Sequence, residues 1–233
     1  MLKRRFSPLM NGGGWRVARI DDYKESFRIA AQELKEADLP RVSRLAGVDA
    51  MVGDKGVTHI RVPFMGVGYL VRVGKDVDVV WDGAVGDVPL PEKILICHYL
   101  LRANGKPPTG DLITFRQIPD GHFYFDAFQR RARDPFLSAF GGDAELFRAC
   151  AQILGGTEVE TGDVAMSFQP FPRISIQLVL WRGDDELPPE AGILFDSSIQ
   201  DSLSAEDIAV LSGMLVYRLM GIARSRQSQS HNK

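Results

Sequence analysis

The alternation of apolar and polar positions predicts two sets of β-strands, each closed by a helix. In the first set, residues 58–62 and 69–73 are rich in β-branched and aromatic side chains, and Pro63, Gly66 and Gly68 between them predict a hairpin with a Pro/Gly turn. A third strand is expected at Val77–Trp81, and a largely apolar helix over residues 92–102 follows it. This order of elements is that of a small antiparallel sheet covered by a helix.

The second set has the same order. Residues 164–168 and 174–181 predict a hairpin around two prolines, and residues 192–196 predict the third strand. The closing helix is expected over residues 205–223. The run Ser204-Ala205-Glu206-Asp207 before it is typical of a capping box, in which a hydroxyl and a carboxylate bind the first free N–H groups of a helix.

The two sets align with one another as a repeat. The segment LAGVDAMVGDKGVTHIRVPFMGVGYLVRVG from Leu45 matches LGGTEVETGDVAMSFQPFPRISIQLVLWRG from Leu154, with Gly47 on Gly156. The sequence therefore predicts an α+β fold with an internal duplication of a β-hairpin/strand/helix unit, an antiparallel sheet, and a helical insert between the copies. A cleft between the two copies is the expected place for a ligand.

The insert opens with a predicted strand at residues 112–118, and the Asp120-Gly121 turn favours a hairpin back along the aromatic run at residues 122–125. Helices are expected after it. Near the N-terminus, apolar residues at helical spacing predict an amphipathic helix. The expected division is an N-terminal arm (1–20), the N-terminal helix with the first repeat (21–105), the insert (106–153), the second repeat (154–223) and a disordered tail (224–233).

The amino-acid composition and net charge argue against several classes of protein. With 45% hydrophobic and 25% charged residues among 233, the chain matches ordinary globular proteins, and its net charge of −2 argues against binding nucleic acid. No run approaches 18 apolar residues, and the basic start lacks the apolar run of a signal peptide, so we expect no membrane span and a cytoplasmic location. Cys97 and Cys150 form no disulfide framework and are expected to be reduced. A homodimer paired through an uncovered sheet edge is a further expectation.

Part of the chain resembles a known family. The segments DPFLSAFGGDAELF and PFPRISIQLVLWRGDDELPPEAGILFD, within residues 89–218, are similar to the domain-of-unknown-function family numbered 3786. The resemblance implies an origin in anaerobic bacteria or archaea. Some members carry an extra four-cysteine iron–sulfur module like that of corrinoid proteins. This chain lacks those cysteines, so the resemblance implies no iron–sulfur cluster within it.

One candidate binding site lies on the aromatic run of the insert. His122 and Tyr124 are expected on one strand, with Arg116 facing them and Arg130 just beyond. Aromatic rings provide a flat apolar wall, arginines bind acidic groups, and a histidine binds a metal or a metal macrocycle. Trp181 is the fifth candidate, although its apolar strand favours a place in the core. The simpler alternative is a packed hairpin with solvated arginines.

Other polar groups have simpler explanations. Asp184, Asp185 and Glu186, with Asp196 and Asp201, have the chemistry to bind a hard cation, but an acidic turn between two strands is the simpler account. His98 and Arg102 share a helix face that suits an anion, with solvent as the expected partner. The chain carries no nucleophile elbow, P-loop or zinc-protease motif.

Two function classes remain from the sequence. The first is a small-molecule or cofactor-binding module of anaerobic metabolism, with a tetrapyrrole or corrinoid as the suggested ligand class. The alternative is an enzyme that uses acidic residues and His122 for acid–base chemistry.

Overall fold

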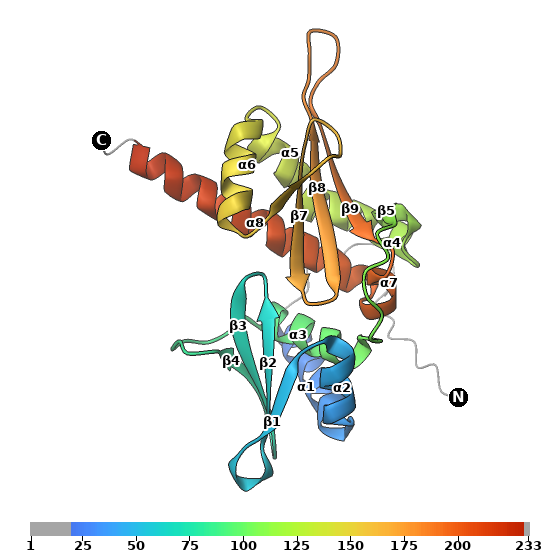
Figure 1. The fold of residues 1–233 in the computed structure, drawn as a ribbon, viewed down its shortest axis with the longest axis vertical. Helices are drawn as coiled ribbons and strands as arrows, with labels where there is room; N and C mark the ends of the chain where they lie inside the picture. Colours follow the sequence, from blue (N-terminus) through green and yellow to red (C-terminus); the bar gives the residue numbers. More distant parts are fainter. Residues whose placement is uncertain (1–19, 231–233) are drawn as a thin grey trace.

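The computed structural model describes residues 20–230 and shows an α+β protein with antiparallel sheets (Figure 1). Residues 1–19 of the predicted arm (1–20) and the last residues 231–233 lie outside this range. The helices are α1 (Ile20–Glu36), α2 (Leu39–Ala46), α3 (Leu90–Arg102), α4 (Gly121–Phe128), α5 (Asp134–Phe140), α6 (Ala144–Ile153), α7 (Ile199–Ser202) and α8 (Ala205–Ser230). Short turns of helix are η1 (Asp54–Gly56), η2 (Phe115–Gln117) and the π-helical η3 (Gln129–Arg133).

The strands form two antiparallel sheets. The first has the order β1-β2-β3-β4, from β1 (Asp49–Val52), β2 (Thr58–Phe64), β3 (Val67–Val73) and β4 (Val77–Trp81). The second has the order β5-β9-β8-β7-β6, from β5 (Leu112–Thr114), β6 (Thr157–Val159), β7 (Val164–Phe171), β8 (Ile174–Trp181) and β9 (Glu190–Asp196). We call residues 20–102 the first unit and residues 112–230 the second unit.

Both units run a helix, a four-stranded meander and a closing helix in the same order. A duplication would produce this shared order, and a common origin of the two halves stays a prediction. The sequence missed β1 and β6, the first strand of each meander, because both are short and mostly exposed and carry no apolar alternation.

The two units meet end to end, with the β7–β8 turn pointing at the first unit (Figure 1). Phe171 at this turn is 1% exposed. Its ring stacks on Tyr99 of α3 at a centroid distance of 4.2 Å and on Phe64 of β2 at 4.6 Å. The hydroxyl of Tyr99 donates in turn to the carbonyl of Ala46 at 2.6 Å. Three buried rings therefore form the core of the contact between the units.

The β2–β3 turn is fixed by the same contact. It is a two-residue turn with Met65 at φ 49° and Gly66 at φ 77°, the pattern of a type I′ hairpin. Met65 is an unfavourable residue for a positive φ, but its N–H donates to the carbonyl of Pro170 in the second unit at 2.9 Å. The sequence placed Pro63 in this turn, which is wrong, because Pro63 lies inside β2.

Helix α8 is the longest helix of the described chain and runs along the second unit beside α4, α5 and α6 (Figure 1). It continues to Ser230, so the predicted end at Ala223 is wrong. Its stretch Ala205–Ser228 is long and apolar enough to cross a membrane by composition. Half of the tested window is buried inside the protein, and a core helix passes the same test.

The insert differs most from the prediction. Only Leu112–Thr114 is a strand, and residues 122–125 lie in helix α4 rather than in a hairpin. Asp120 adopts a positive φ of 62° and leads into α4, so the chain turns into a helix there. The buried positions behind it follow a helical period: Ala127, Phe128, Ala132, Phe136 and Phe140. Alternation over four aromatic residues was too short to distinguish a strand from this helix.

The π-helical segment η3 has a local cause. Pro135 has no N–H to offer the carbonyl of Arg131, and its ring would crowd that carbonyl in a regular α-helix. The helix widens instead, and the N–H of Asp134 bonds to the carbonyl of Gln129. Residues 121–140 thus form one continuous helical run.

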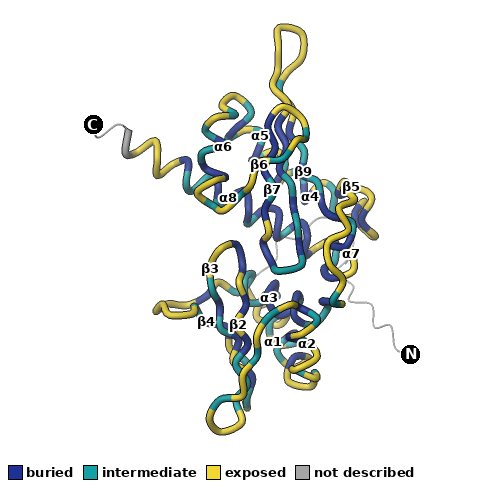
Figure 2. Tube along the Cα trace, viewed as in Figure 1, coloured by how far each residue is buried: buried dark blue, intermediate teal, exposed yellow. Residues whose placement is uncertain are grey.

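The buried residues of the two units form one continuous cluster across their contact. Figure 2 shows buried positions along β7, β8 and α3, whereas the β8–β9 and β1–β2 turns are largely exposed. The core is therefore continuous from one unit to the other through the ring stack around Phe171.

We predict that Phe171→Ala lowers the free energy of unfolding by about 3–5 kcal/mol, because it empties a stacked site between two buried rings. Urea denaturation followed by circular dichroism measures the change. The matched control is Phe123→Ala, whose side chain is 49% exposed and which should cost far less. Equal losses for the two variants would contradict this role of Phe171.

Candidate functional site

A group of polar side chains gathers where the start of α8 meets α3 and α4. We call it the junction cluster, and its members are His98 and Arg102 of α3, Tyr124 of α4, and Ser204, Glu206 and Asp207 at the start of α8. Both units contribute to it. It is a concentration of titratable groups at a contact between structural units, a common location for binding sites.

Asp207 is the centre of this cluster. Its Oδ1 lies 2.7 Å from Nδ1 of His98, and its Oδ2 lies 3.1 Å from a guanidinium nitrogen of Arg102. Ser204 donates to Oδ2 through its hydroxyl at 2.6 Å and its N–H at 3.2 Å. The N–H of Asp207 returns a bond to the Ser204 hydroxyl oxygen at 3.2 Å, so the predicted capping box is confirmed.

Asp207 is ionised despite being buried. Burial alone would raise the pKa of its carboxyl. The hydrogen bond and charge of His98, the bond from Ser204 and the charge of Arg102 outweigh burial and hold that pKa below its usual value. The position at the first turn of α8 also favours a negative charge, because the free N–H groups of a helix start are partly positive.

The ionised carboxylate sets the tautomer of His98. A carboxylate only accepts hydrogen bonds, so Nδ1 of His98 carries a proton and donates it to Asp207. In the neutral ring, Nε2 is then unprotonated and offers its lone pair on the opposite side. The side chain of His98 is 25% exposed. The cluster thus holds one imidazole in a fixed orientation and leaves it partly open to a ligand.

Glu206 and Tyr124 form the outer edge of the cluster. The Tyr124 hydroxyl lies 3.5 Å from a carboxylate oxygen of Glu206 and donates to it. Glu206 as a residue is exposed, yet protein atoms crowd its carboxylate, and this desolvation with the charge of Asp207 raises its pKa. Burial and the charge of Glu206 raise the pKa of Tyr124. Burial thus moves the pKa of both groups upward.

The five residues that the sequence singled out do not form one site. Tyr124 alone joins the junction cluster. Arg116 lies in η2 and packs its guanidinium over the ring of Phe125, 4.0 Å from the centroid. His122 is exposed on α4 with its ring 3.8 Å from that of Phe123. Arg130 is exposed in η3, on the same helical run.

Trp181 lies apart from these residues, at the end of β8 beside the β8–β9 turn. It is 38% exposed, so the expectation of a core position is wrong. The ring lies against Gly162 and Gly192, where a Cβ atom would come within 3.0 Å or less of it. The two glycines make room for an indole that covers the end of the sheet.

The acidic residues of the sequence also have structural partners. Asp184 accepts bonds from the N–H groups of Glu186 and Leu187, which confirms the acidic turn. Asp201 forms an ion pair with Lys106 at 2.9 Å. Within residues 20–230, no group of three or more His, Cys, Asp or Glu side chains is arranged to hold a metal ion.

Asp196, at the end of β9, holds the linker between the units. It is 3% exposed. It accepts bonds from the N–H and hydroxyl of Thr109, the N–H of Gly110, and the N–H and hydroxyl of Ser198. Burial would raise its pKa, but these five donors outweigh burial and lower the pKa to about 2.

Sequence reasoning missed the central pair of the site. The sequence placed His98 and Arg102 on one face suited to an anion, and the expectation that solvent is their partner is wrong. The anion is Asp207, 109 residues from His98. The sequence feature that pointed to Asp207 was the capping box, because it places this carboxylate at the start of a largely apolar helix. Cys97 and Cys150 are both free and buried, and burial raises the pKa of Cys97 to about 12.

The model of one protein family covers most of both units. The model of the family described as "Domain of unknown function (DUF3786)" matches residues 38–218, more than three quarters of the chain. The chain belongs to this family. The DUF3786 match begins at the N-cap of α2 and ends at Arg218 in α8, so it includes both sheets and the complete junction cluster. Neither the curated proteins nor the solved structures give a significant match.

We predict that acid removes a specific part of the stability through Asp196. The pKa of this carboxyl is lowered from 3.8 to about 2, so its ionisation stabilises the fold above pH 4 and the contribution disappears as the pH falls through 2. In Asp196→Asn, the free energy of unfolding at pH 7 should fall by about 2–3 kcal/mol, because the new amide repels some of the five donors.

Urea denaturation between pH 2 and pH 7 measures both effects. The control is Asp185→Asn, on the exposed β8–β9 turn, which should leave stability and its pH profile unchanged. A profile for Asp196→Asn as steep as that of the wild type would show that another carboxyl is responsible.

Proposed function

We propose that this chain is a cofactor-binding module that presents His98 to the metal of a planar cofactor, with a tetrapyrrole or corrinoid as the ligand class. The observation that carries the proposal is the hydrogen-bonded chain Ser204–Asp207–His98. A carboxylate bound to the inner nitrogen of an imidazole fixes its tautomer and orientation and makes the outer nitrogen a stronger ligand. Metal-binding histidines are held in this way.

The metal-binding groups present favour a metal whose other ligands belong to the cofactor itself. Within the described residues no cluster of three metal-binding side chains exists, so the protein alone has too few ligands for a bare ion. A single oriented imidazole would suit a metal macrocycle, which needs only one ligand from the protein. Such a cofactor would supply redox or group-transfer chemistry, and this chain would supply its binding and orientation.

The surroundings of His98 suit the acidic side chains of such a cofactor. Arg102 is 37% exposed beside the imidazole, and Arg131 is close enough to Glu206 for its charge to lower the pKa of that carboxyl. The Tyr124 hydroxyl, whose pKa is raised by burial, keeps its proton and would donate it to a ligand carboxylate or amide in place of its 3.5 Å bond to Glu206. The cluster thus combines one ligand to a metal with donors for anionic groups.

We predict that haemin or aquocobalamin added to the wild-type protein gives a saturable shift of its absorption bands, because the imidazole of His98 would bind the metal. His98→Ala should abolish the shift. In His98→Gly, free imidazole should restore it, because the small ligand fits the space of the missing ring. Circular dichroism verifies that each variant is folded.

The matched control is His122→Ala, which removes an exposed histidine that no hydrogen bond ties to a carboxylate within residues 20–230. This variant should shift like the wild type. A wild-type protein that gives no saturable change with either cofactor would refute the proposal. Loss of the shift in His122→Ala but not in His98→Ala would place the ligand at the site expected from the sequence.

The enzyme alternative stays a prediction. Its acid–base pair is better placed at His98 and Glu206 than at His122, because the first histidine has an orienting carboxylate and the second does not.

A further inference from the structure

The second sheet has one face packed on helices and one face that reaches solvent. Alternate side chains of a strand point to opposite sides of its sheet. Met166, Leu178 and Ile193 lie side by side on the packed face, are at most 4% exposed, and belong to the core that α5 and α6 cover. On the other side, most positions are exposed or half-buried. We call that side the open face.

A row of uncharged side chains crosses the open face. The strand register places one residue of each strand in this row, in the order Thr157, Ser167, Gln177, Leu194 and Thr114. Neighbours in such a row point to the same side of the sheet. Every position except Leu194 carries a hydroxyl or an amide, which both donates and accepts hydrogen bonds. The row therefore presents polar groups without charge.

Gln177, at the centre of the row, has donors that the protein does not use. Its amide oxygen accepts a bond from the hydroxyl of Thr161 at 3.4 Å. Its NH₂ group carries two donors and makes no hydrogen bond within residues 20–230. The amide is half-buried, so its hydrogens reach solvent only through the open face. A ligand on this face would find them available.

Trp181 lies on the same face, because it is four residues from Gln177 along β8. Its indole reaches across the sheet. A Cβ atom on Gly192 of β9 would come within 2.9 Å of the ring, and one on Gly162, before β7, within 3.0 Å of the indole nitrogen. The two glycines leave the ring lying along the sheet, with 38% of the residue exposed. An aromatic surface thus stands next to the polar row.

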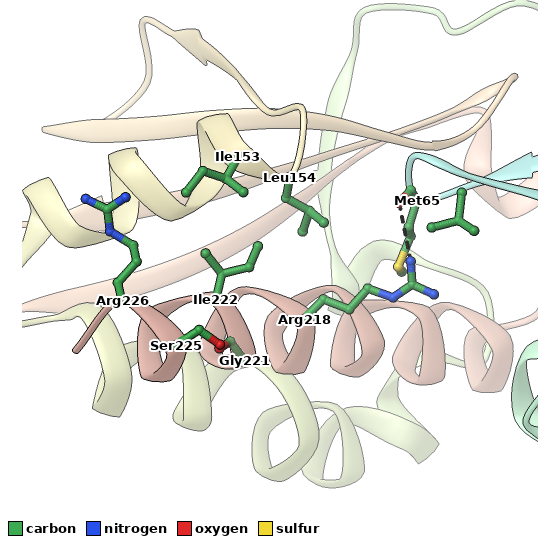
Figure 3. Close-up of a pocket in the computed structure, with 9 residues that line it drawn as sticks. Met65, Ile153, Leu154, Arg218, Gly221, Ile222, Ser225 and Arg226 are labelled. Atoms are coloured by element: carbon green, nitrogen blue, oxygen red, sulfur yellow. Dashed lines mark hydrogen bonds between the residues drawn. The ribbon is translucent and has the colours of Figure 1, made fainter. Parts of the chain in front are cut away.

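The charge of the open face excludes anionic ligands. Strands β5 to β9 contain no lysine or arginine. The groove between the β2–β3 turn and α8 differs in this respect, because Arg218 and Arg226 line it (Figure 3). A phosphate or sulfate on the open face would meet no cation from these strands and would meet the exposed Glu190 beside Trp181. The face is complementary to a neutral polar molecule.

We propose that the open face binds a neutral, linear oligosaccharide. The C–H groups of a sugar ring pack on the electron-rich face of an aromatic ring, and its hydroxyls exchange hydrogen bonds with amides and hydroxyls. Trp181 supplies the ring, and Gln177 with its row supplies the polar groups. They are about 13 Å apart along β8, so a chain of sugars is needed to contact both. Sheet faces bind oligosaccharides in other folds. None of these residues belongs to the junction cluster, so this site goes beyond the proposed cofactor site.

The test is calorimetric titration of cellohexaose, an extended neutral chain, into the full-length protein. The wild type should bind it with a dissociation constant of roughly 0.1–1 mM, as expected for one aromatic contact and a few hydrogen bonds. Hexagalacturonate, a chain of the same length with a carboxylate on each ring, should not bind. Trp181→Ala should weaken cellohexaose binding about tenfold or more. The matched control is Phe123→Ala, which removes an exposed aromatic residue of α4 and should bind like the wild type.

A second variant tests the polar row without removing a large side chain. Gln177→Leu keeps a side chain of similar size beside Leu194 and removes the amide. It should weaken cellohexaose binding about tenfold while the melting temperature stays the same or rises, and it decides the question if Trp181→Ala fails to fold. His98→Ala should bind cellohexaose like the wild type, so this proposal and the proposed cofactor site fail independently.

Four outcomes overturn the proposal. The wild type does not bind cellohexaose, or it binds hexagalacturonate as tightly. Folded Trp181→Ala or Gln177→Leu binds cellohexaose like the wild type. Phe123→Ala loses as much affinity as Trp181→Ala does.

Discussion

The insertion of the β7–β8 turn into the first unit is the contact on which the other features depend. Phe171 lies between Phe64 and Tyr99, and the carbonyl of Pro170 holds Met65 in its left-handed conformation. Each unit alone would expose these rings and leave the turn strained. Because the contact is apolar and stacked, it fixes how the units face one another, and the polar contacts between α3 and α8 form within that frame.

Two polar networks connect α3 with α8 at different positions along the two helices. The Asp207 network joins the C-terminal half of α3 to the start of α8, and the Glu92–Arg218 network joins the start of α3 to a later turn of α8. In both networks a carboxylate of one unit is paired with a cationic side chain of the other. The first network leaves an imidazole partly open, whereas the second holds Met65 of the β2–β3 turn against α8. Alignment of α3 with α8 thus determines the geometry of the junction cluster.

The hairpin and third strand of each unit, the capping box and the closing helices were predictable because each depends on local periodicity or on residues three apart, as in Ser204 and Asp207. The helical nature of residues 122–125 was not, since four aromatic residues in succession have no period and their helix is defined by its burial against α8. The His98–Asp207 pair was beyond prediction for a different reason. Periodicity places each residue on a helix face, but only the packing of the two units brings faces 109 residues apart into contact.

The clamp of Asp196 on Thr109 and Gly110 has a consequence for the motion of the units. Only residues 103–108 remain between the end of α3 and the clamped loop, and six residues span at most about 20 Å when extended. If the ring stack opens, Tyr99 and Phe171 stay tethered at short range. A short tether corresponds to a millimolar effective concentration, so the separated units rejoin as an intramolecular reaction rather than by diffusion. Opening of the protein is therefore brief and self-correcting.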